Sequence, residues 1–168
     1  MSDTRHTQIH IMHVRQNIAK VVEDLFDRSG RHDASKLVEP EAESFARIEV
    51  ERTGVVYGTP EYTAMMASVQ PAIDHHYANN DHHPEHFPNG INDMNLMQIT
   101  EMLCDWKAAS MRGQQRPFLE GMTNVSKERF GIDDQLFAVL VNTVKALGWD
   151  ESPTHPDDGR TGMGEEGA

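Results

Sequence analysis

The chain has 168 residues, a formal net charge of −12 and 38% hydrophobic residues. This length suits one domain with a real core, and the composition is typical of a soluble globular protein and excludes a disordered one. The negative charge disfavours a nucleic acid polymer as partner, because proteins that bind such polymers neutralise phosphates with basic residues. A small-molecule substrate is easier to reconcile with this charge.

No apolar run approaches the roughly 18 residues that a membrane span needs. The first residues, MSDTRHTQ, also lack the apolar stretch of a secretory signal. We therefore expect a cytoplasmic protein with no membrane partner. The single cysteine, Cys104, cannot form an internal disulfide and excludes a zinc site made of several thiolates. Any metal must then be held by nitrogen and oxygen ligands.

Three helices are predicted in the first half of the chain. The first covers residues 5 to 28 and ends before Gly30, with one apolar stripe formed by Ile11, Val14, Ile18, Val21, Val22 and Leu25. The second begins near Arg31, or the chain turns through HDASK and restarts at Pro40. The third covers residues 60 to 79, with His76 on its apolar stripe and His75 pointing away.

The second half of the chain predicts a loop, two further helices and a tail. Pro84 excludes helical geometry at His83, Asp93 is expected to cap a helix over residues 94–112, and a last helix covers residues 133–148. Residues 151–168 are expected to form a disordered acidic tail. No strand pattern is found. The sequence thus predicts an all-α fold, a single helical domain of five or six helices over residues 1–150.

Imidazole and carboxylate groups that could bind a metal occur at three places. His32 and Asp33 are neighbours near a helix start, although such a pair alone usually lies in water. On the first helix we favour His10, at the edge of the apolar stripe, over His13, which lies further toward solvent. Asp105 lies beside small residues, which favours an inward position; the alternative is a salt-bridge ladder on a solvated face.

The order His, His-Asp, Asp on successive helices resembles the HD-domain superfamily of metal-dependent phosphohydrolases. The stretches that carry the resemblance are HIMHV, HDASKLVEPE, HYANNDHHPEH and EMLCDWKAA. They are more similar still to an uncharacterised HD-like family of bacteriophages and bacteria, over roughly residues 6 to 147. The resemblance implies an HD-like helical domain in which His10, His32, Asp33 and Asp105 hold a divalent metal: Mn, Fe, Zn, Co or Mg.

Residues 74–87 contain five of the ten histidines. In HD proteins with two metals, extra histidines between the HD pair and the last Asp hold the second ion. By this resemblance His76, His82 and His83 are positioned for that role. Alternatively, these three line the pocket and donate hydrogen bonds to phosphate, or the loop is polar and bonded to its own backbone. His75 and His86 are expected to be structural or to face solvent.

The resemblance implies a metal-dependent phosphohydrolase of a small phosphate ester, with a nucleotide or deoxynucleotide as the expected substrate. Lys36, Arg112 and Lys107 would offset the charge of the phosphoryl group. Small nucleotidases of the superfamily often carry Glu where this chain has Lys36, so the proton acceptor would be Glu41, a loop histidine or the acidity of metal-bound water itself.

The alternative function belongs to another class. In that case the chain is a non-catalytic HD-like protein, such as a phage accessory protein, in which a structural metal holds the fold while the surface binds a protein partner. Metal ligation stabilises the fold in both cases, so stabilisation by metal does not separate them. The sequence leaves the oligomeric state open.

Overall fold

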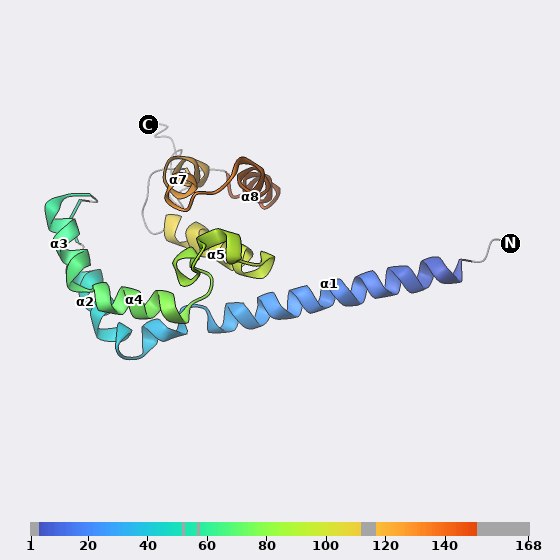
Figure 1. Ribbon diagram of the computed structural model, residues 1–168, viewed down its shortest axis with the longest axis horizontal. Coiled ribbons are helices and arrows are strands. Elements are labelled where there is room, and N and C mark those ends of the chain that lie inside the picture. Colours follow the sequence, from blue (N-terminus) through green and yellow to red (C-terminus); the bar gives the residue numbers. More distant parts are fainter. Residues whose placement is uncertain (1–3, 52, 57, 112–116, 151–168) are drawn as a thin grey trace, which may run out of the picture. The chain divides into compact units, whose positions relative to one another are not determined.

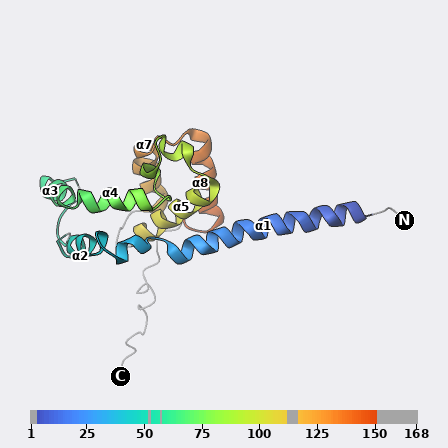
Figure 2. The same ribbon diagram turned by 60° about the horizontal axis from the view of Figure 1, so that its bottom comes forward.

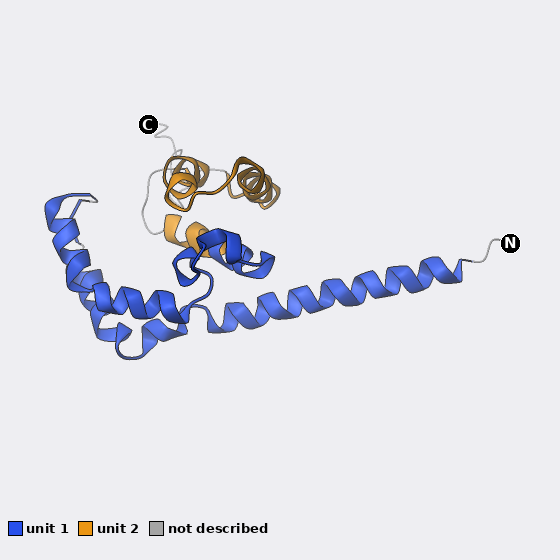
Figure 3. Ribbon diagram, in the orientation of Figure 1, with its two compact units in different colours: residues 1–102 blue, residues 103–168 orange. Residues whose placement is uncertain are grey.

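A computed structural model describes residues 4–51, 53–56, 58–111 and 117–150 (Figures 1 and 2). These residues form helices and turns with no strand among them, which confirms the predicted all-α fold. The chain divides into two compact units, Met1–Met102 and Leu103–Ala168 (Figure 3). Within the described ranges, no helix is long and apolar enough to cross a membrane. The predicted tail, residues 151–168, lies outside the described residues.

Helix α1 is one continuous helix, Arg5–Arg31, of 27 residues. It runs through Gly30, where the sequence predicted its end, and stops at His32, whose backbone is extended (φ −49°, ψ 127°). The buried Arg28 donates hydrogen bonds to Asp24, Asp81 and Glu101. These bonds fix the last turns of α1 and offset the low helix propensity of Gly30.

The HD segment, residues 32–37, and the three helices that follow it pack together in the first unit. A 3-10 helix, Ala34–Leu37, leads into α2, Glu41–Glu51, so the chain restarts close to Pro40. The predicted helix over residues 60–79 is instead two helices, α3 (Pro60–Ser68) and α4 (Gln70–Asn79). Pro71, in the first turn of α4, has no N–H and cannot continue the hydrogen bonds of α3. Helix α4 packs on α2 and on the 3-10 helix.

Two 3-10 segments, Pro84–His86 and Gly90–Asp93, connect α4 to the next helix. His83 is extended (φ −94°, ψ 128°), which confirms the prediction from the proline that follows it. The segment therefore turns His82 and His83 back toward the end of α4 and does not continue that helix.

Helix α5, Leu96–Ser110, is capped by Asn95 and not by Asp93 as predicted. Asn95 Oδ1 accepts hydrogen bonds from the backbone N–H groups of Met97 and Gln98, and Gln98 Oε1 accepts one from the N–H of Asn95. This reciprocal pattern is a capping box. Gln98 also donates a hydrogen bond to Asp81, at 2.7 Å. This bond connects the start of α5 to the histidine-rich loop, residues 80–87, that follows α4.

Among its described residues, the second unit contains the end of α5 and three further helices: α6 (Phe118–Gly121), α7 (Lys127–Arg129) and α8 (Asp134–Ala146). A π-helical stretch, Met122–Ser126, precedes α7. Of the three further helices, the sequence predicted only α8. The Trp106 and Phe130 rings stack with their centroids 5.4 Å apart. Asp133 caps α8 by accepting a hydrogen bond from the N–H of Leu136. The helix thus begins one residue later than predicted and ends two residues earlier.

Candidate metal centre

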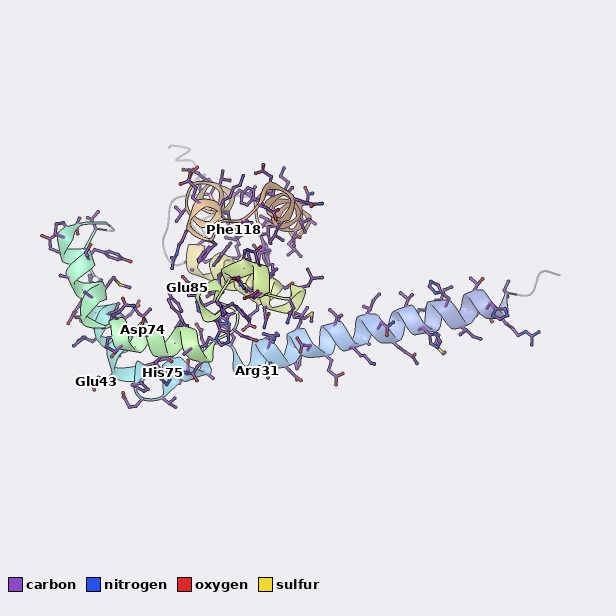
Figure 4. The ribbon with its side chains drawn as sticks, viewed as in Figure 1. Arg31, Glu43, Asp74, His75, Glu85 and Phe118 are labelled. Carbon is purple, nitrogen blue, oxygen red and sulfur yellow. The ribbon has the colours of Figure 1, made fainter. Side chains whose placement is uncertain are left out.

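Side chains from four segments of the first unit meet where α1 ends. They are His32 at the end of α1, Asp33 before the 3-10 helix, His76 in the last turn of α4, and His82 and His83 in the loop after α4. Figure 4 draws these side chains and labels two of their neighbours, Arg31 on α1 and His75 on α4. We call Asp33, His76, His82 and His83 the imidazole cluster.

The donor atoms of the imidazole cluster all lie within 4.8 Å of one another. Asp33 Oδ1 is 3.3 Å from His76 Nε2 and 3.5 Å from His82 Nε2. His83 Nε2 is 2.9 Å from His76 Nε2, and His32 Nε2 lies 3.5 Å from the other oxygen of Asp33. Ligands placed about 2.0–2.1 Å from one ion at neighbouring tetrahedral or octahedral positions are ~2.8–3.4 Å apart. The observed separations are therefore close to those of donors around a single ion.

The carboxylates of Glu41 and Glu101 contact the imidazole rings at Nδ1, the nitrogen on the side of each ring away from Asp33. Oε2 of the fully buried Glu41 lies 2.9 Å from His76 Nδ1. Glu101 Oε1 lies 2.9 Å from His32 Nδ1 and 3.3 Å from His82 Nδ1. A tautomer with the proton on Nδ1 donates to these carboxylates and leaves Nε2 available to a metal ion. Metal-binding histidines usually donate their second N–H to a carboxylate or carbonyl in this way.

Asp33 is the residue around which the cluster is built, and its backbone and side chain are both unusual. Its φ of +55° lies in the left-handed region, which Asp tolerates better than most residues but which still costs energy. Within the described part of the chain, its buried Oδ1 has no hydrogen-bond partner, since His76 Nε2 lies near it without the required alignment. A buried carboxylate oxygen without a donor is destabilising unless a cation neutralises it. The donor set therefore fits a divalent metal.

The charge state of the cluster's carboxylate also suits a metal. Burial raises the pKa of the Asp33 carboxyl, but His76 and the ammonium of Lys36, 2.5 Å from Oδ2, outweigh it and hold this pKa well below its usual range. For Glu41, burial again raises the pKa, and the hydrogen bonds from His75, Ser35 and His76 lower it overall. Both groups are therefore carboxylates at neutral pH.

Arg28 supports this arrangement from α1. Its Nη1 donates to Glu101 at 3.0 Å and to Asp81 at 2.9 Å, and its Nη2 donates to the second oxygen of Asp81 at 3.2 Å. Burial raises the pKa of Asp81, and the hydrogen bonds from Arg28 and Gln98 lower it overall. The guanidinium thus connects the carboxylate behind His32 and His82 to the loop that carries His82.

The structure does not bring His10 to the cluster, which corrects a prediction from the sequence. His10 lies 22 residues before His32 on the continuous helix α1. At about 1.5 Å of rise per residue, this spacing separates the two by ~33 Å along the helix axis. The His10 side chain is exposed. His10 and His32 of one chain therefore cannot hold one ion.

The other predicted ligand, Asp105, lies in the second unit and is half-buried. It follows Glu101 by four residues on the continuous helix α5, so the two side chains share a helix face. Its role as a ligand stays a prediction from the sequence.

The structure gives a different result for each of the three predicted catalytic residues, Glu41, Lys36 and Arg112. Glu41 does not fit the expected role of proton acceptor, because it is fully buried and its two oxygens accept hydrogen bonds from His75, His76 and Ser35. The Glu41 carboxylate, 2.9 Å from His76 Nδ1, is instead placed to orient the His76 ring. Lys36 forms an ion pair with Asp33, and Arg112 lies outside the described residues.

Two polar residues of this region were not recognised as part of the site from the sequence. Glu101 accepts hydrogen bonds from both Arg28 and His32. The buried Asn80 donates to Ser35 Oγ and to the carbonyl of His76, each at 2.8 Å. Glu101 lies in the motif EMLCDW and Asn80 in the motif HYANNDHH, and these motifs were the only indication in the sequence that the two residues belong to the site. The residues that they contact lie far away in the sequence, so their roles could not be predicted.

Comparison with known proteins gives a family but no function. The model of DUF5662, described as a family of unknown function, matches residues 2–146. No curated protein and no solved structure matches the chain.

Proposed function

Because the chain belongs to DUF5662, whose function is unknown, we propose a function from the imidazole cluster. The protein is a metal-dependent phosphohydrolase of a small phosphate ester, with a nucleotide or deoxynucleotide as substrate. The observation that carries this proposal is the convergence of three imidazoles and a carboxylate at distances of 2.9–3.5 Å. Such a nitrogen-rich donor set favours Mn, Fe, Co or Zn over Mg, which prefers oxygen ligands.

In this proposal the residues of the cluster bind the metal ion, and two neighbouring carboxylates orient the imidazole rings. Asp33, His76, His82 and His83 would hold the ion, while Glu41 and Glu101 keep protons on the Nδ1 atoms behind the rings. The bound ion would supply Lewis acidity toward a phosphoryl oxygen and toward water. The sequence resemblance adds Asp105 as a further ligand.

Two side chains beside the cluster have properties that suit a phosphate ester. The Lys36 side chain is 33% exposed, so its ammonium can offset phosphoryl charge from the solvent side of Asp33. His32, with a side chain 28% exposed, lies 2.9 Å from Glu101 and presents an imidazole nitrogen beside the cluster. This replaces Glu41, which is buried behind His76, as the candidate proton acceptor.

A second candidate function rests on the burial of the cluster. His76 and His82 are only 3% and 2% exposed, and the cluster joins α4, the histidine-rich loop and the HD segment. An ion in such a position can act mainly as a structural crosslink. The protein would then be non-catalytic and would bind a protein partner through its surface.

Phosphate release separates the two functions. Chelator-stripped protein is supplied with Mn²⁺, Co²⁺, Zn²⁺ or Mg²⁺ and assayed with a panel of nucleoside mono- and triphosphates. The proposal predicts metal-dependent release that disappears in Asp33→Asn and persists in His86→Gln, whose exposed histidine lies in the same loop outside the cluster. Stoichiometric metal binding without release from any ester would instead establish the non-catalytic function.

A further inference from the structure

A network of hydrogen bonds lies behind the imidazole cluster, at the nitrogen of His76 that faces away from Asp33. The Ser35 hydroxyl is at its centre, because Oγ donates to Glu41 Oε2 at 3.0 Å and accepts from Asn80 Nδ2 at 2.8 Å. Nδ2 of the buried Asn80 also donates to the carbonyl oxygen of His76, at 2.8 Å. Ser35 Oγ and Asn80 Nδ2 lie 3.3 Å and 3.0 Å from His76 Nδ1. Both side chains are therefore close enough to act on this ring nitrogen.

The direction of each hydrogen bond in this network follows from groups that can act in only one way. A carbonyl oxygen only accepts, so the Asn80 atom beside the His76 carbonyl is the amide NH₂ group. Its two hydrogens go to the two nearest acceptors, that carbonyl and Ser35 Oγ. Because Ser35 Oγ accepts from Asn80, its own hydrogen is directed to the Glu41 carboxylate, which only accepts.

This order of hydrogen bonds decides which nitrogen of His76 carries the hydrogen. Both hydrogens of the Asn80 amide are engaged, so His76 Nδ1 receives none from it. Glu41 Oε2, 2.9 Å from Nδ1, is an acceptor, so Nδ1 is the donor. An Nδ1 lone pair directed at this buried carboxylate would be unfavourable. A neutral ring with its hydrogen on Nδ1 has its lone pair on Nε2, the atom 3.3 Å from Asp33 Oδ1.

We propose that Ser35 and Asn80 are positioning residues of the metal site. Asn80 directs the Ser35 hydroxyl to Glu41, and Ser35 in turn keeps the second N–H of Asn80 away from His76 Nδ1. Together they hold the ring in the tautomer whose Nε2 is able to bind a metal ion. This inference deepens the proposed function and rests on it for the metal, whereas the tautomer is a property of the metal-free protein.

NMR of the metal-free full chain with isotope-labelled histidine measures the tautomer, because protonated and unprotonated ring nitrogens give separate signals. Spectra are recorded above the pH range in which histidine ordinarily titrates, and His76→Gln identifies the His76 signals. The wild type is expected to carry the hydrogen on Nδ1. In Ser35→Ala, the freed N–H of Asn80 is 3.0 Å from Nδ1 and can donate to it, so a fraction with the hydrogen on Nε2 is expected. Ser35→Thr keeps the hydroxyl and should keep the wild-type tautomer.

Two results would overturn the proposal. One is a wild-type His76 ring with its hydrogen on Nε2. The other is a His76 tautomer in Ser35→Ala that is the same as in the wild type.

A second substitution separates positioning from a loss of structure. In the Ser35→Ala background, Asn80→Ala removes the competing N–H, so the His76 ring is expected to return to the tautomer with its hydrogen on Nδ1. Loss of packing alone would instead disturb the ring further, and that result would contradict the role of Asn80. Circular dichroism checks that the variants keep their helices.

Asn79→Ala is the matched control. The exposed Asn79 donates to the carbonyl of His75, which Figure 4 labels on α4, at 2.8 Å, as Asn80 does to that of His76. Its loss should leave the His76 signals unchanged. A change as large as that in Ser35→Ala would show that any weakening of this turn alters the ring, against the proposal.

Isothermal titration calorimetry with Zn²⁺ connects the tautomer to the metal site. Ser35→Ala is expected to bind Zn²⁺ about 10-fold more weakly than the wild type, and Ser35→Thr and Asn79→Ala should bind it equally well. A changed tautomer with unchanged affinity would contradict the positioning role. A wild type that binds no Zn²⁺ would refute the proposed function and the metal role together, while the NMR measurement would still decide the order of hydrogen bonds through Ser35 and Asn80.

Discussion

Oε2 of Glu41, a side chain with no exposed surface, lies 2.9 Å from Nδ1 of His76, while Nε2 of the same ring faces Asp33 at 3.3 Å. The ring is thus held between two carboxylates, one on each nitrogen. The outer carboxylate fixes which nitrogen carries the proton, and so decides which nitrogen is able to bind a metal. We therefore expect Glu41 to influence metal binding at His76 Nε2 through the ring, from the nitrogen that faces away from Asp33.

Glu41→Gln is expected to lower the affinity for Zn²⁺ or Co²⁺ by about 10- to 100-fold, the usual effect of losing such a partner. Gln keeps the shape of Glu but replaces one carboxylate oxygen with an amide N–H₂ group. Glu43→Gln, an exposed position on the same helix, is the matched control. Isothermal titration calorimetry measures both variants, and equal affinities would contradict the positioning role of Glu41.

Arg28→Met is expected to destabilise the protein by about 2 kcal/mol, because Glu101 and Asp81 lose their hydrogen-bond donor. The Arg28 and Glu101 side chains are only 9% and 11% exposed, so water replaces these hydrogen bonds poorly. Arg31→Met, an exposed position in the last turn of α1, should leave stability nearly unchanged. Urea unfolding compares the two. An equal effect of both substitutions would show that the Arg28 network contributes little.

Asp81→Asn is expected to destabilise the metal-free protein at neutral pH but not in acid. Because the pKa of Asp81 is lower in the folded than in the unfolded state, its carboxylate stabilises the fold above the ordinary Asp value of about 3.9. That contribution disappears as the pH falls through the lowered folded pKa. The melting temperatures of wild type and variant should therefore converge below about pH 4. A difference that stays constant from pH 7 to pH 3 would exclude this origin.

Asn95→Ala is expected to cost about 1 kcal/mol, because the first turn of α5 loses its cap and Gln98 loses its reciprocal partner. Asn92→Ala, an exposed neighbour outside the cap, serves as the control. Urea unfolding of the two variants shows whether the helix is stabilised at Asn95. A smaller loss at Asn95 than at Asn92 would be incompatible with the observed capping box.

Helical periodicity was sufficient to predict the elements that bury an apolar stripe. It placed His76 inward on α4, where it is 3% exposed. It did not show that Pro71 divides residues 60–79 into α3 and α4, because a proline is also compatible with the interior of a kinked helix. The short helices α6 and α7 were missed since three or four residues show no periodicity.

The site was predictable in its residue types and less so in its geometry. His32, Asp33, His76, His82 and His83 were all named from the sequence, and the structure brings them together. His10 was placed beside them by the resemblance, and a helix wheel reports the face of a residue without its distance along the axis. The roles of Glu41 and Glu101 depend on contacts with residues 35 and 69 positions away, which local pattern does not reveal.

The measurement that tests the central claim most directly is metal stoichiometry with X-ray absorption spectroscopy on the zinc-loaded full chain. The account predicts one tightly bound ion in the imidazole cluster with several imidazole nitrogens in its coordination shell. It also predicts loss of that ion in His76→Gln and its retention in His86→Gln. No stoichiometric binding in the wild type, or an unchanged coordination shell in His76→Gln, would contradict the account.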